Sequence, residues 1–445
     1  MSHQDSGSTT PDIARSGQID QDTGMPILAM PHEGLPELVD SPEALTRCIE
    51  ALASGTGPVA IDTERAQSFR YTARAYLLQF RRTDSGTWLI DPQAFQPSDG
   101  SLADFSALRE AIASAEWIIH AATQDLPCLV EIGLYPSRLF DTELAGRLLG
   151  FPHVSLGTMI EQHFGVHLLK EHSAADWSRR PLPPDWIAYA ALDVELLIEL
   201  RNLVADELVA AGKKEWADEE FAHLVDVYRH PQQRPGDPWR HTSGSHHVRS
   251  RRGLALVRAL WEQRDEIARE LDKAPGKIVP DKAISELASE VTKDSEKMPT
   301  ARDMNKIMGF RRTYAKRYRD RWVAASQQVG QLSAKQLPPM RVPHEGPPHQ
   351  AHSWQRTHPE AWARWQVVRP AANEIAEQIG MPPENLIQPE ALRWLVWKPL
   401  PQINEQAVRA RLSEHGVRHW QQDLLAARFA ELLAAVPGPG DGSSA

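Results

Sequence analysis

Cysteine is scarce in this chain, and apolar runs of membrane-spanning length are missing. The 445 residues include only two cysteines, Cys48 and Cys128, which lie in separate apolar segments. Their number and separation exclude a disulfide framework or a zinc cluster and favour a reducing compartment in which both thiols are buried. The polar N-terminus lacks the apolar core of a signal peptide. We therefore expect a soluble, cytoplasmic protein that does not enter a membrane.

Positive charge is also in deficit, because the formal net charge is −10. This total is unusual for a protein that binds nucleic acid. Its distribution is uneven, however: residues 249–335 contain 20 Lys and Arg against 12 Asp and Glu, a balance of +8 that leaves −18 for the remaining residues. A basic module attached to acidic parts indicates a nucleic-acid-binding appendage. A helical domain with many solvated charges is the alternative explanation.

Segments rich in proline and glycine divide the chain, which is too long for one hydrophobic core. Residues 229–247 and 336–353 are dense in Pro, Gly, His or Ser, so we predict a linker at each. The other predicted parts are a disordered tail over 1–35, an α/β domain over 36–228, two small all-α domains over 248–335 and 354–436, and a flexible tail over 437–445.

Short apolar runs in the first domain predict a sheet. PVAID, AYLLQFRR and GTWLIDP have strand character, and the turn signal TDSG joins the second to the third, which favours an antiparallel meander. AEWIIHAA predicts another strand, before a helix that begins at Asp125. Helical patterns interleave with these strands, so we expect an α/β domain with a mixed sheet. Ser41 and Pro42 predict the start of its first helix.

Acidic residues lie in an order that outweighs the rest of the sequence. Asp62 and Glu64 are two apart on a predicted strand and therefore share a face. Tyr189 and Asp193 are four apart on a predicted helix and share a face one turn apart. Asp125 lies between these pairs in the chain. Convergent carboxylates suit Mg²⁺ or Mn²⁺ rather than zinc, and two such ions roughly 3.5–4 Å apart are suited to phosphodiester hydrolysis.

Roles other than binding a metal ion are expected for several residues of this region. Tyr189, with an ordinary pKa of about 10, is a poor base, so we expect its hydroxyl to orient the attacking water by a hydrogen bond. Asp125 can also cap the helix that follows it. We expect Asp141, in LFDTELAG, to be a helix cap or a support for the site, and His120 to be a satisfied histidine at a strand end.

Over the same region the chain carries, in order, the motifs AIDTE, LLQF, WLIDP, HAATQDL, LFDTELAGRLLG, DWSRRPL and YAALDVELL. In this series it resembles the tyrosine subclass of the DEDD 3′–5′ exonucleases, and ribonuclease D in particular, over about residues 36–330. The resemblance implies a ribonuclease H-like fold and release of nucleoside 5′-monophosphates from RNA 3′ ends, with tRNA precursors or other structured RNA as substrates. It also implies that Tyr189 positions the water and that two divalent ions, Mg²⁺ or Mn²⁺, are bound by Asp62, Glu64, Asp125 and Asp193.

The basic module resembles the helicase-and-ribonuclease-D C-terminal (HRDC) domain, through RRGLALVRALWEQRDEIARE, PGKIVPD and GFRRTYAKRYRDRW. The resemblance implies an auxiliary nucleic-acid-binding role. Basic residues with interleaved tyrosines suit salt-sensitive, sequence-blind contact with a phosphate backbone, and our candidates are Arg311, Arg312 and Lys316. Residues 354–436, which include ALRWLVWKP, resemble a second and more divergent HRDC-like domain.

Three arginines outside this module are further candidates for binding RNA. Arg65 directly follows Glu64, where many family members have a bulky apolar residue. An arginine there can stack on a base or hold a phosphate, so we expect the terminal nucleotide to dock differently. Arg179 and Arg180 lie in DWSRRPL, where contact with the substrate backbone competes with salt bridges to the acidic first domain.

Two other functions compete with an exoribonuclease. A proofreading-type 3′–5′ DNA exonuclease shares the catalytic residues, but the remaining helical residues leave no room for a polymerase domain. A catalytically silent RNA-binding protein would have the same fold, but decayed sites usually lose a carboxylate, and all four are present here. We therefore predict a metal-dependent 3′–5′ exoribonuclease whose partner is RNA with a free 3′ end, without an obligate protein partner.

Overall fold

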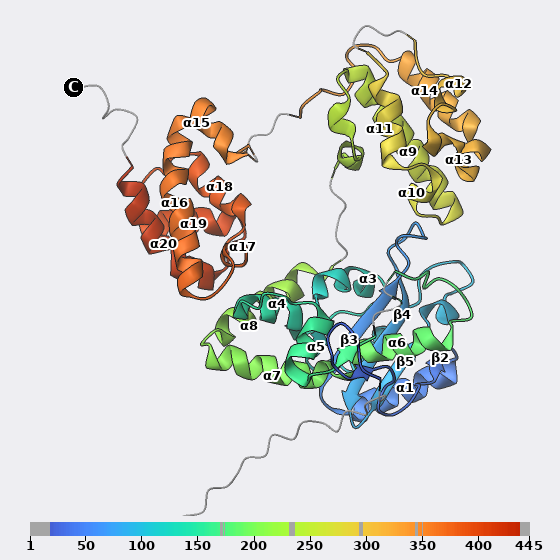
Figure 1. The fold of residues 1–445 in the computed structure, drawn as a ribbon, viewed down its shortest axis with the longest axis vertical. Helices are drawn as coiled ribbons and strands as arrows, with labels where there is room; N and C mark the ends of the chain where they lie inside the picture. The colour runs from blue at the N-terminus through green and yellow to red at the C-terminus, as the bar shows by residue number, and fades with distance from the viewer. Residues whose placement is uncertain are drawn as a thin grey trace, which may run out of the picture.

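The computed structural model describes one α/β domain and two helical domains (Figure 1). It covers residues 18–169, 172, 174–230, 236–292, 297–342, 346–348 and 350–436. None of the helices in this part of the chain combines the length and the apolar character that crossing a membrane requires. The predicted C-terminal tail, 437–445, lies outside the described residues. Both cysteines are buried and free, as predicted.

A six-stranded mixed sheet forms the centre of the first domain (Figure 1). Its strand order is β2-β5-β4-β3-β6-β7. The strands are β2 (Leu38–Val39), β3 (Thr56–Arg65), β4 (Ala75–Thr83), β5 (Gly86–Ile90), β6 (Trp117–Ile119) and β7 (Leu139–Asp141). β4 pairs antiparallel with both β3 and β5, whereas β2–β5, β3–β6 and β6–β7 are parallel. The predicted mixed sheet and its β3–β4–β5 meander are therefore confirmed.

Helices flank this sheet and carry two of the five predicted catalytic residues, Tyr189 and Asp193. α1 (Pro42–Ser54) begins where the sequence predicts, because the Ser41 hydroxyl accepts a hydrogen bond from the Ala44 amide. The other helices are α2 (Ser106–Ala111), α3 (Leu126–Val130), α4 (Thr142–Leu149), α5 (Leu156–Phe164), α6 (Pro184–Glu195), α7 (Leu197–Ala210) and α8 (Lys214–Val227). α6 contacts β3, β4 and β5, and α7 contacts β3 and β6. Helix α6 therefore faces the strand that carries Asp62 and Glu64.

Part of the predicted disordered tail is ordered. β1 (Ile27–Leu28) pairs in parallel with β8 (His167–Leu168), and Leu28 is buried. The pairing uses backbone groups and a distant segment, which a composition poor in large apolar residues does not exclude. The prediction was therefore wrong for residues 18–35, and residues 1–17 lie outside the described part of the chain.

The second domain is all-α and has its own hydrophobic core. Its helices are α9 (Arg251–Leu271), α10 (Pro275–Ile278), α11 (Asp281–Ser289), α12 (Ala301–Met304), α13 (Thr313–Arg317) and α14 (Arg319–Gly330). The long α9 packs against α11 and α14, and Leu260, Ile284 and Trp322 are buried in the core that these helices enclose. The apolar stripe of α9 is what the periodicity of the basic module predicts.

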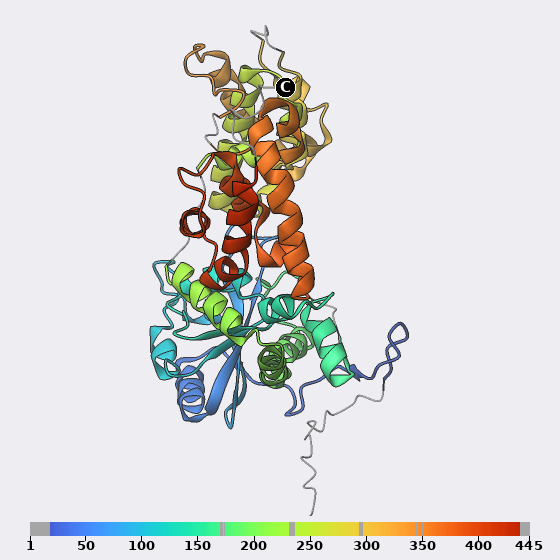
Figure 2. The same cartoon turned by 90° about the vertical axis from the view of Figure 1, so that its left-hand side faces the viewer.

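The third domain is also all-α. Its helices are α15 (Trp354–Thr357), α16 (Pro359–Gln378), α17 (Pro383–Leu386), α18 (Pro389–Trp397), α19 (Glu405–Glu414) and α20 (His419–Ala434). Buried side chains of this domain and of the first domain form one continuous cluster. Figure 2 shows the third domain, orange to red, standing against the first. The indole rings of Trp216 in α8 and Trp420 in α20 stack at this boundary, with ring centroids 4.9 Å apart.

Both predicted linkers are shorter than expected. Two 3₁₀ helices, Pro238–His241 and Ser245–His247, lie within the first predicted linker, and Trp239 is buried in the core of the second domain. At the other end, Arg251 donates hydrogen bonds to the backbone carbonyls of Leu337 and Pro338. Proline-rich chain can pack on a domain without regular structure, so its composition overstates the length of a linker.

Candidate active site

Strand β3 and helix α6 bring the two predicted acidic pairs together. Asp62 lies opposite Gln79 of β4 and Glu64 lies opposite Leu77, so both carboxylates project from one face of β3. Helix α6 packs on the sheet beside β3 and carries Asp193. The carboxylate oxygens of Asp62, Glu64 and Asp193 lie within 4.8 Å of one another. Residues 131 positions apart in the chain therefore form one acidic group.

The protonation of this group is governed by burial and by mutual repulsion. Burial raises the pKa of Asp62 well above its ordinary value, and the neighbouring carboxylates of Asp125 and Asp193 raise it further. The pKa of Glu64 is raised in the same way, first by burial and then by Asp62 and Asp193. A divalent cation would relieve this repulsion, and an all-oxygen donor set is what a hard cation requires. The three residues therefore fit a divalent-cation site.

Asp125 lies beside this group and is not one of its three members. Its carboxylate accepts a hydrogen bond of 2.6 Å from the Thr63 hydroxyl and lies 3.7 Å from the Arg65 guanidinium. Burial raises its pKa to about 6, although Arg65 and Thr63 both act to lower it. Asp125 occupies the N-cap position of α3, as the sequence predicts, but its side chain makes no capping bond there. The Asp125 carboxylate is held instead by Thr63 and Arg65, which alternate along β3 with Asp62 and Glu64 and so project from its other face.

Tyr189 reaches the same acidic group from α6. Its hydroxyl is hydrogen-bonded to Asp193. Burial raises the pKa of Tyr189, and the nearby carboxylates of Asp193, Glu64 and Asp62 raise it further. The hydroxyl therefore stays protonated and can orient a water molecule but cannot remove its proton, as the sequence predicts.

Two ring side chains, His172 and Trp177, lie beside the ring of Tyr189, and His172 was not predicted from the sequence. The His172 ring lies edge-on to Tyr189 with centroids 5.8 Å apart, and the His172 Nε2 atom lies 3.1 Å from an oxygen of Asp185. Trp177 is fully buried, with its ring 6.2 Å from that of Tyr189. His172 could not be predicted, because its distance from α6 in the sequence follows no strand or helix period that would place the two side by side.

Asp141 holds the turn that precedes Asp125. Its carboxylate accepts hydrogen bonds from the Ala121 and Ala122 amides, at 3.0 and 2.8 Å, and from two amides in the first turn of α4. Ala121 has a positive φ of 61°, an uncommon backbone conformation that these bonds stabilise. The expected role of Asp141 as cap and support is confirmed.

His120 is structural, as expected. Its Nδ1 atom lies 2.9 Å from the Thr142 hydroxyl. Burial lowers its pKa to about 4, so the ring is neutral at physiological pH.

The predicted RNA-binding arginines divide into engaged and exposed side chains. Arg180 forms a bidentate ion pair with Asp91, at 2.5 and 2.6 Å, which is the salt-bridge alternative. Arg65 contacts Asp125 and the Gln124 carbonyl. The others lie exposed on the surface: Arg179 in the first domain, and Arg311, Arg312 and Lys316 in the second. Arg311 and Arg312 also donate hydrogen bonds to the backbone carbonyls of Asn305 and Gly276.

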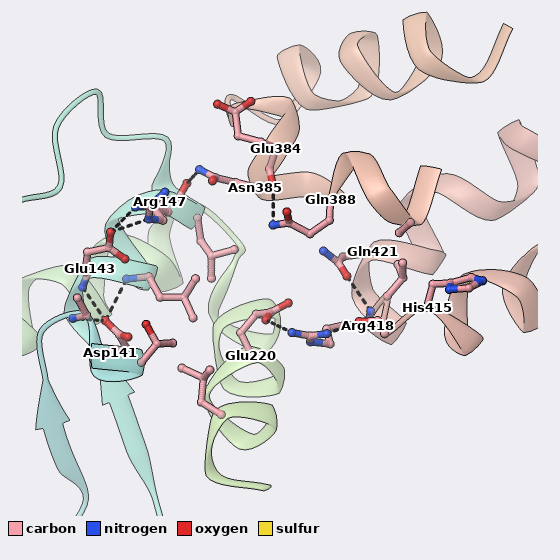
Figure 3. A pocket seen from close by; sticks show the side chains of 18 of the residues that line it. Asp141, Glu143, Arg147, Glu220, Glu384, Asn385, Gln388, His415, Arg418 and Gln421 are labelled. Carbon is pink, nitrogen blue, oxygen red and sulfur yellow. Dashed lines mark hydrogen bonds and ion pairs between the residues drawn. The ribbon is translucent and has the colours of Figure 1, made fainter. Parts of the chain in front are cut away.

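One cavity is lined by a member of the acidic group, and a larger one is lined by Asp141. A cavity of about 220 Å³ is lined by residues 63–69 together with Ala174 and Ala175, and so includes the Glu64 side of the acidic group. A cavity of about 390 Å³ lies between the first and third domains (Figure 3). It is lined by Asp141, Glu220 and Arg418 among others, and it contains none of the acidic group. The first cavity is therefore the candidate for the substrate.

Comparison with protein families accounts for each domain. Residues 36–208 match the 3′–5′ exonuclease family, residues 253–325 match the HRDC domain, and residues 346–433 match the 3′ to 5′ exonuclease C-terminal domain. Ribonuclease D of Acidiphilium cryptum is 32% identical over 277 residues, which are 61% of this chain and 67% of that protein. Ribonuclease D of Bartonella henselae is 28% identical over 252 residues, 56% of this chain and 60% of that protein.

Solved structures share the arrangement of domains. A protein from Bifidobacterium adolescentis is 37% identical, with a TM-score of 0.81 over 92% of this chain and 100% of its own. Escherichia coli ribonuclease D is 22% identical, with a TM-score of 0.64 over 90% of this chain and 99% of its own, a likeness of fold. By the sequence match to ribonuclease D, the family matches and the shared fold, the chain belongs to the ribonuclease D family of 3′–5′ exoribonucleases.

Proposed function

We propose that this chain shortens RNA from its 3′ end by divalent-metal-dependent hydrolysis and releases nucleoside 5′-monophosphates. The observation that most supports the proposal is the convergence of Asp62, Glu64 and Asp193, whose carboxylate oxygens lie within 4.8 Å of one another. The hydroxyl of Tyr189, which donates its hydrogen bond to Asp193, adds an oxygen that can accept a hydrogen bond from water at the same place.

Each side chain of the proposed site has a chemical task. Asp62, Glu64 and Asp193 would hold divalent cations, and Asp125 would complete the set of ligands. Bound divalent cations lower the pKa of a water ligand and stabilise negative charge on the leaving oxygen. Tyr189 orients the attacking water through a neutral hydroxyl.

Arg65 has two tasks in the proposal. It lies 3.7 Å from Asp125 and so helps to fix that carboxylate, while its side chain keeps 21% of its surface exposed. The exposed part of the guanidinium faces solvent and can bind a phosphate or stack on the terminal base. The departure from an apolar residue at this position therefore changes nucleotide docking and leaves the reaction unchanged.

The finer parts of the proposal rest on the resemblance to ribonuclease D. We place the reaction on tRNA precursors or other structured RNA in the cytoplasm, with two Mg²⁺ or Mn²⁺ ions and without an obligate protein partner. We propose that the chain comprises an exonuclease domain, an HRDC domain and a second HRDC-like domain. The exposed Arg179, Arg311, Arg312 and Lys316 are proposed to contact phosphates, since cationic side chains on a surface give salt-sensitive affinity.

The test is a comparison of Asp193→Asn with the wild-type chain on 5′-labelled RNA in Mg²⁺. We expect a ladder of shortened products from the wild type and a loss of rate on the order of a thousandfold in the variant, because a shared cation ligand is removed. Asp206→Asn is the matched control, since Asp206 is an exposed aspartate on the neighbouring helix α7. Full activity of Asp193→Asn, or internal cuts, would overturn the proposal.

The same gel separates the rival functions. Preferential digestion of DNA would favour a proofreading-type exonuclease, and a mobility shift without products would favour a catalytically silent RNA-binding protein. Neither is favoured by the family to which the chain belongs, since its relatives from Acidiphilium cryptum and Bartonella henselae are ribonucleases.

A further inference from the structure

The loop between β3 and β4 connects the candidate active site with the second domain. It comprises residues 66–74 and leaves β3 directly after Glu64 and Arg65. Its first half, up to Phe69, lines the cavity of about 220 Å³ beside the acidic group. The shape of that cavity therefore depends on where this loop lies.

The second half of the loop is fastened to helix α9 and the residues that follow it. The Tyr71 hydroxyl donates to the Asp265 carboxylate, at 2.9 and 3.0 Å from its two oxygens, and the Tyr71 ring packs against the core of the second domain. The Tyr71 amide donates to Asp272 at 3.3 Å. The Ala274 amide donates to the Phe69 carbonyl at 3.1 Å. The loop is thus bonded to the second domain through both backbone and side chains.

Arg70 joins the two walls of the cavity. Its guanidinium lies 3.3 Å from Asp272 and donates a hydrogen bond of 2.6 Å to the Ser178 hydroxyl. Ser178 is buried and follows closely on Ala174 and Ala175, which form the opposite wall. One side chain therefore links the loop, the opposite wall and the end of α9.

The start of the loop packs on the first domain, because Ala66 and Phe69 belong to an apolar cluster that includes Trp177. Within the loop, the amides of Phe69 and Arg70 donate to the Ala66 carbonyl, and the described residues 66–74 form no helix or strand. Segments with few internal contacts open easily unless other parts of the protein hold them. The contacts with the second domain therefore fix the loop from the Phe69 carbonyl onward, and through it the end of this wall of the cavity.

We propose that the HRDC domain positions the 66–69 wall of the catalytic cavity through Tyr71, Asp265 and Arg70, so that its docking controls turnover at the 3′ end. The proposal rests on the proposed function and adds to it a role in which the domain acts on the site itself. Tyr71 and Arg70 are positioning residues, since they join the loop to its supports, Asp265, Asp272 and Ser178.

Positioning differs from tethering in what it predicts for short substrates. A domain that only grips the body of a long RNA raises affinity for long RNA and does nothing for a trinucleotide, which has no body to grip. A domain that shapes the cavity changes the turnover of both. The trinucleotide therefore distinguishes the two roles.

The experiment compares Tyr71→Phe and Asp265→Ala with the wild-type full chain on a trinucleotide and on a long 5′-labelled RNA. We expect kcat to fall roughly three- to tenfold on both substrates, with a smaller change in KM. The double variant should lose no more than the stronger single variant, since both changes break one contact. Glu262→Ala is the matched control, because Glu262 lies three residues from Asp265 on α9 with its side chain 57% exposed.

Hydrogen exchange of the loop amides provides a readout that does not depend on activity. We expect faster exchange at residues 69–71 in Tyr71→Phe and Asp265→Ala, and unchanged exchange in Glu262→Ala. Wild-type turnover of the trinucleotide in both variants overturns the positioning role, even if long RNA is affected. Unchanged exchange at the loop also overturns it. If Asp193→Asn showed the proposed function to be wrong, the exchange result would still decide whether the domain orders the loop.

Discussion

The Thr63 hydroxyl donates a hydrogen bond of 2.6 Å to Asp125, although the two residues lie 62 positions apart. Thr63 stands between Asp62 and Glu64 on β3, and alternation along the strand turns it to the opposite face. One strand therefore supplies two members of the acidic group directly and fixes a further predicted ligand from its other side.

Removal of this hydrogen bond should shift the pH dependence of the reaction. In Thr63→Val the contact that lowers the pKa of Asp125 is lost, so that pKa should rise above about 6. The acid limb of the pH–rate profile should move to higher pH, with a loss of about tenfold near pH 6. Thr63→Ser keeps the hydroxyl and should retain the wild-type profile. An unshifted profile in Thr63→Val would contradict this role.

Divalent cations should stabilise the protein more as pH rises. The pKa values of Asp62, Glu64 and Asp125 are raised in the folded protein, so ionising these groups costs folding stability, and this part of the stability is lost as pH rises through those values. A bound cation offsets that loss. We therefore expect Mg²⁺ to raise the melting temperature by a few degrees at pH 7.5 and by much less at pH 5.

Asp193→Asn provides the control for this effect, since it removes one member of the acidic group. Its melting temperature should respond weakly to Mg²⁺ at both pH values. Equal stabilisation at pH 5 and pH 7.5 in the wild type would show that the cation binds elsewhere.

Loss of the Tyr189 hydroxyl should lower turnover and spare RNA binding. The hydroxyl donates to Asp193 and stays protonated, so Tyr189→Phe removes an oxygen that accepts a hydrogen bond from the attacking water. We expect kcat to fall about a hundredfold with KM little changed. Tyr76→Phe is the matched control: Tyr76 is buried in β4, and its hydroxyl has no hydrogen-bond partner among the described residues. A similar loss in both variants would indicate general loosening of the core.

Asp141 should contribute more to stability than an ordinary helix cap. Its carboxylate accepts four backbone amides, whereas Ser155, at the start of α5, accepts one. Asp141→Ala should lower the free energy of unfolding by about 2–4 kcal/mol, and Ser155→Ala by about 1 kcal/mol. Urea unfolding of the two variants provides the measurement, and equal losses would contradict the role of Asp141 in the turn before Asp125.

Glu220 should hold the third domain on the first. It accepts a hydrogen bond of 3.0 Å from the Trp420 indole. Its carboxylate also lies 3.1 Å from the Arg418 guanidinium, an ion pair that Figure 3 shows. Glu220→Gln weakens a buried ion pair, so we expect about 1–3 kcal/mol of lost stability and faster proteolysis between the domains. Glu215→Gln, an exposed position on the same helix, should behave as wild type. An unchanged protease pattern would show that other contacts suffice.

Much of the site follows from local spacing. Residues two apart on a strand, or four apart on a helix, share a face whatever the rest of the fold is. The sequence therefore pairs Asp62 with Glu64 and Tyr189 with Asp193 correctly. The strands of the meander were predicted for the same reason, since the periodicity and the turn signal lie within a few neighbouring residues.

Relations between distant segments could not be predicted in this way. The bond of Thr63 to Asp125, the ion pair of Arg180 with Asp91, and the contact of Tyr71 with Asp265 join residues 62, 89 and 194 positions apart. The ordering of residues 18–35 on β8 belongs to the same class. Periodicity records only which side chains of one segment share a face. Which segments meet depends on how the sheet, α6 and α9 pack together. The sequence alone therefore identified the acidic residues and the chemistry that they suggest. The contacts that support Asp125 and form the wall of the cavity could be identified only from the tertiary structure.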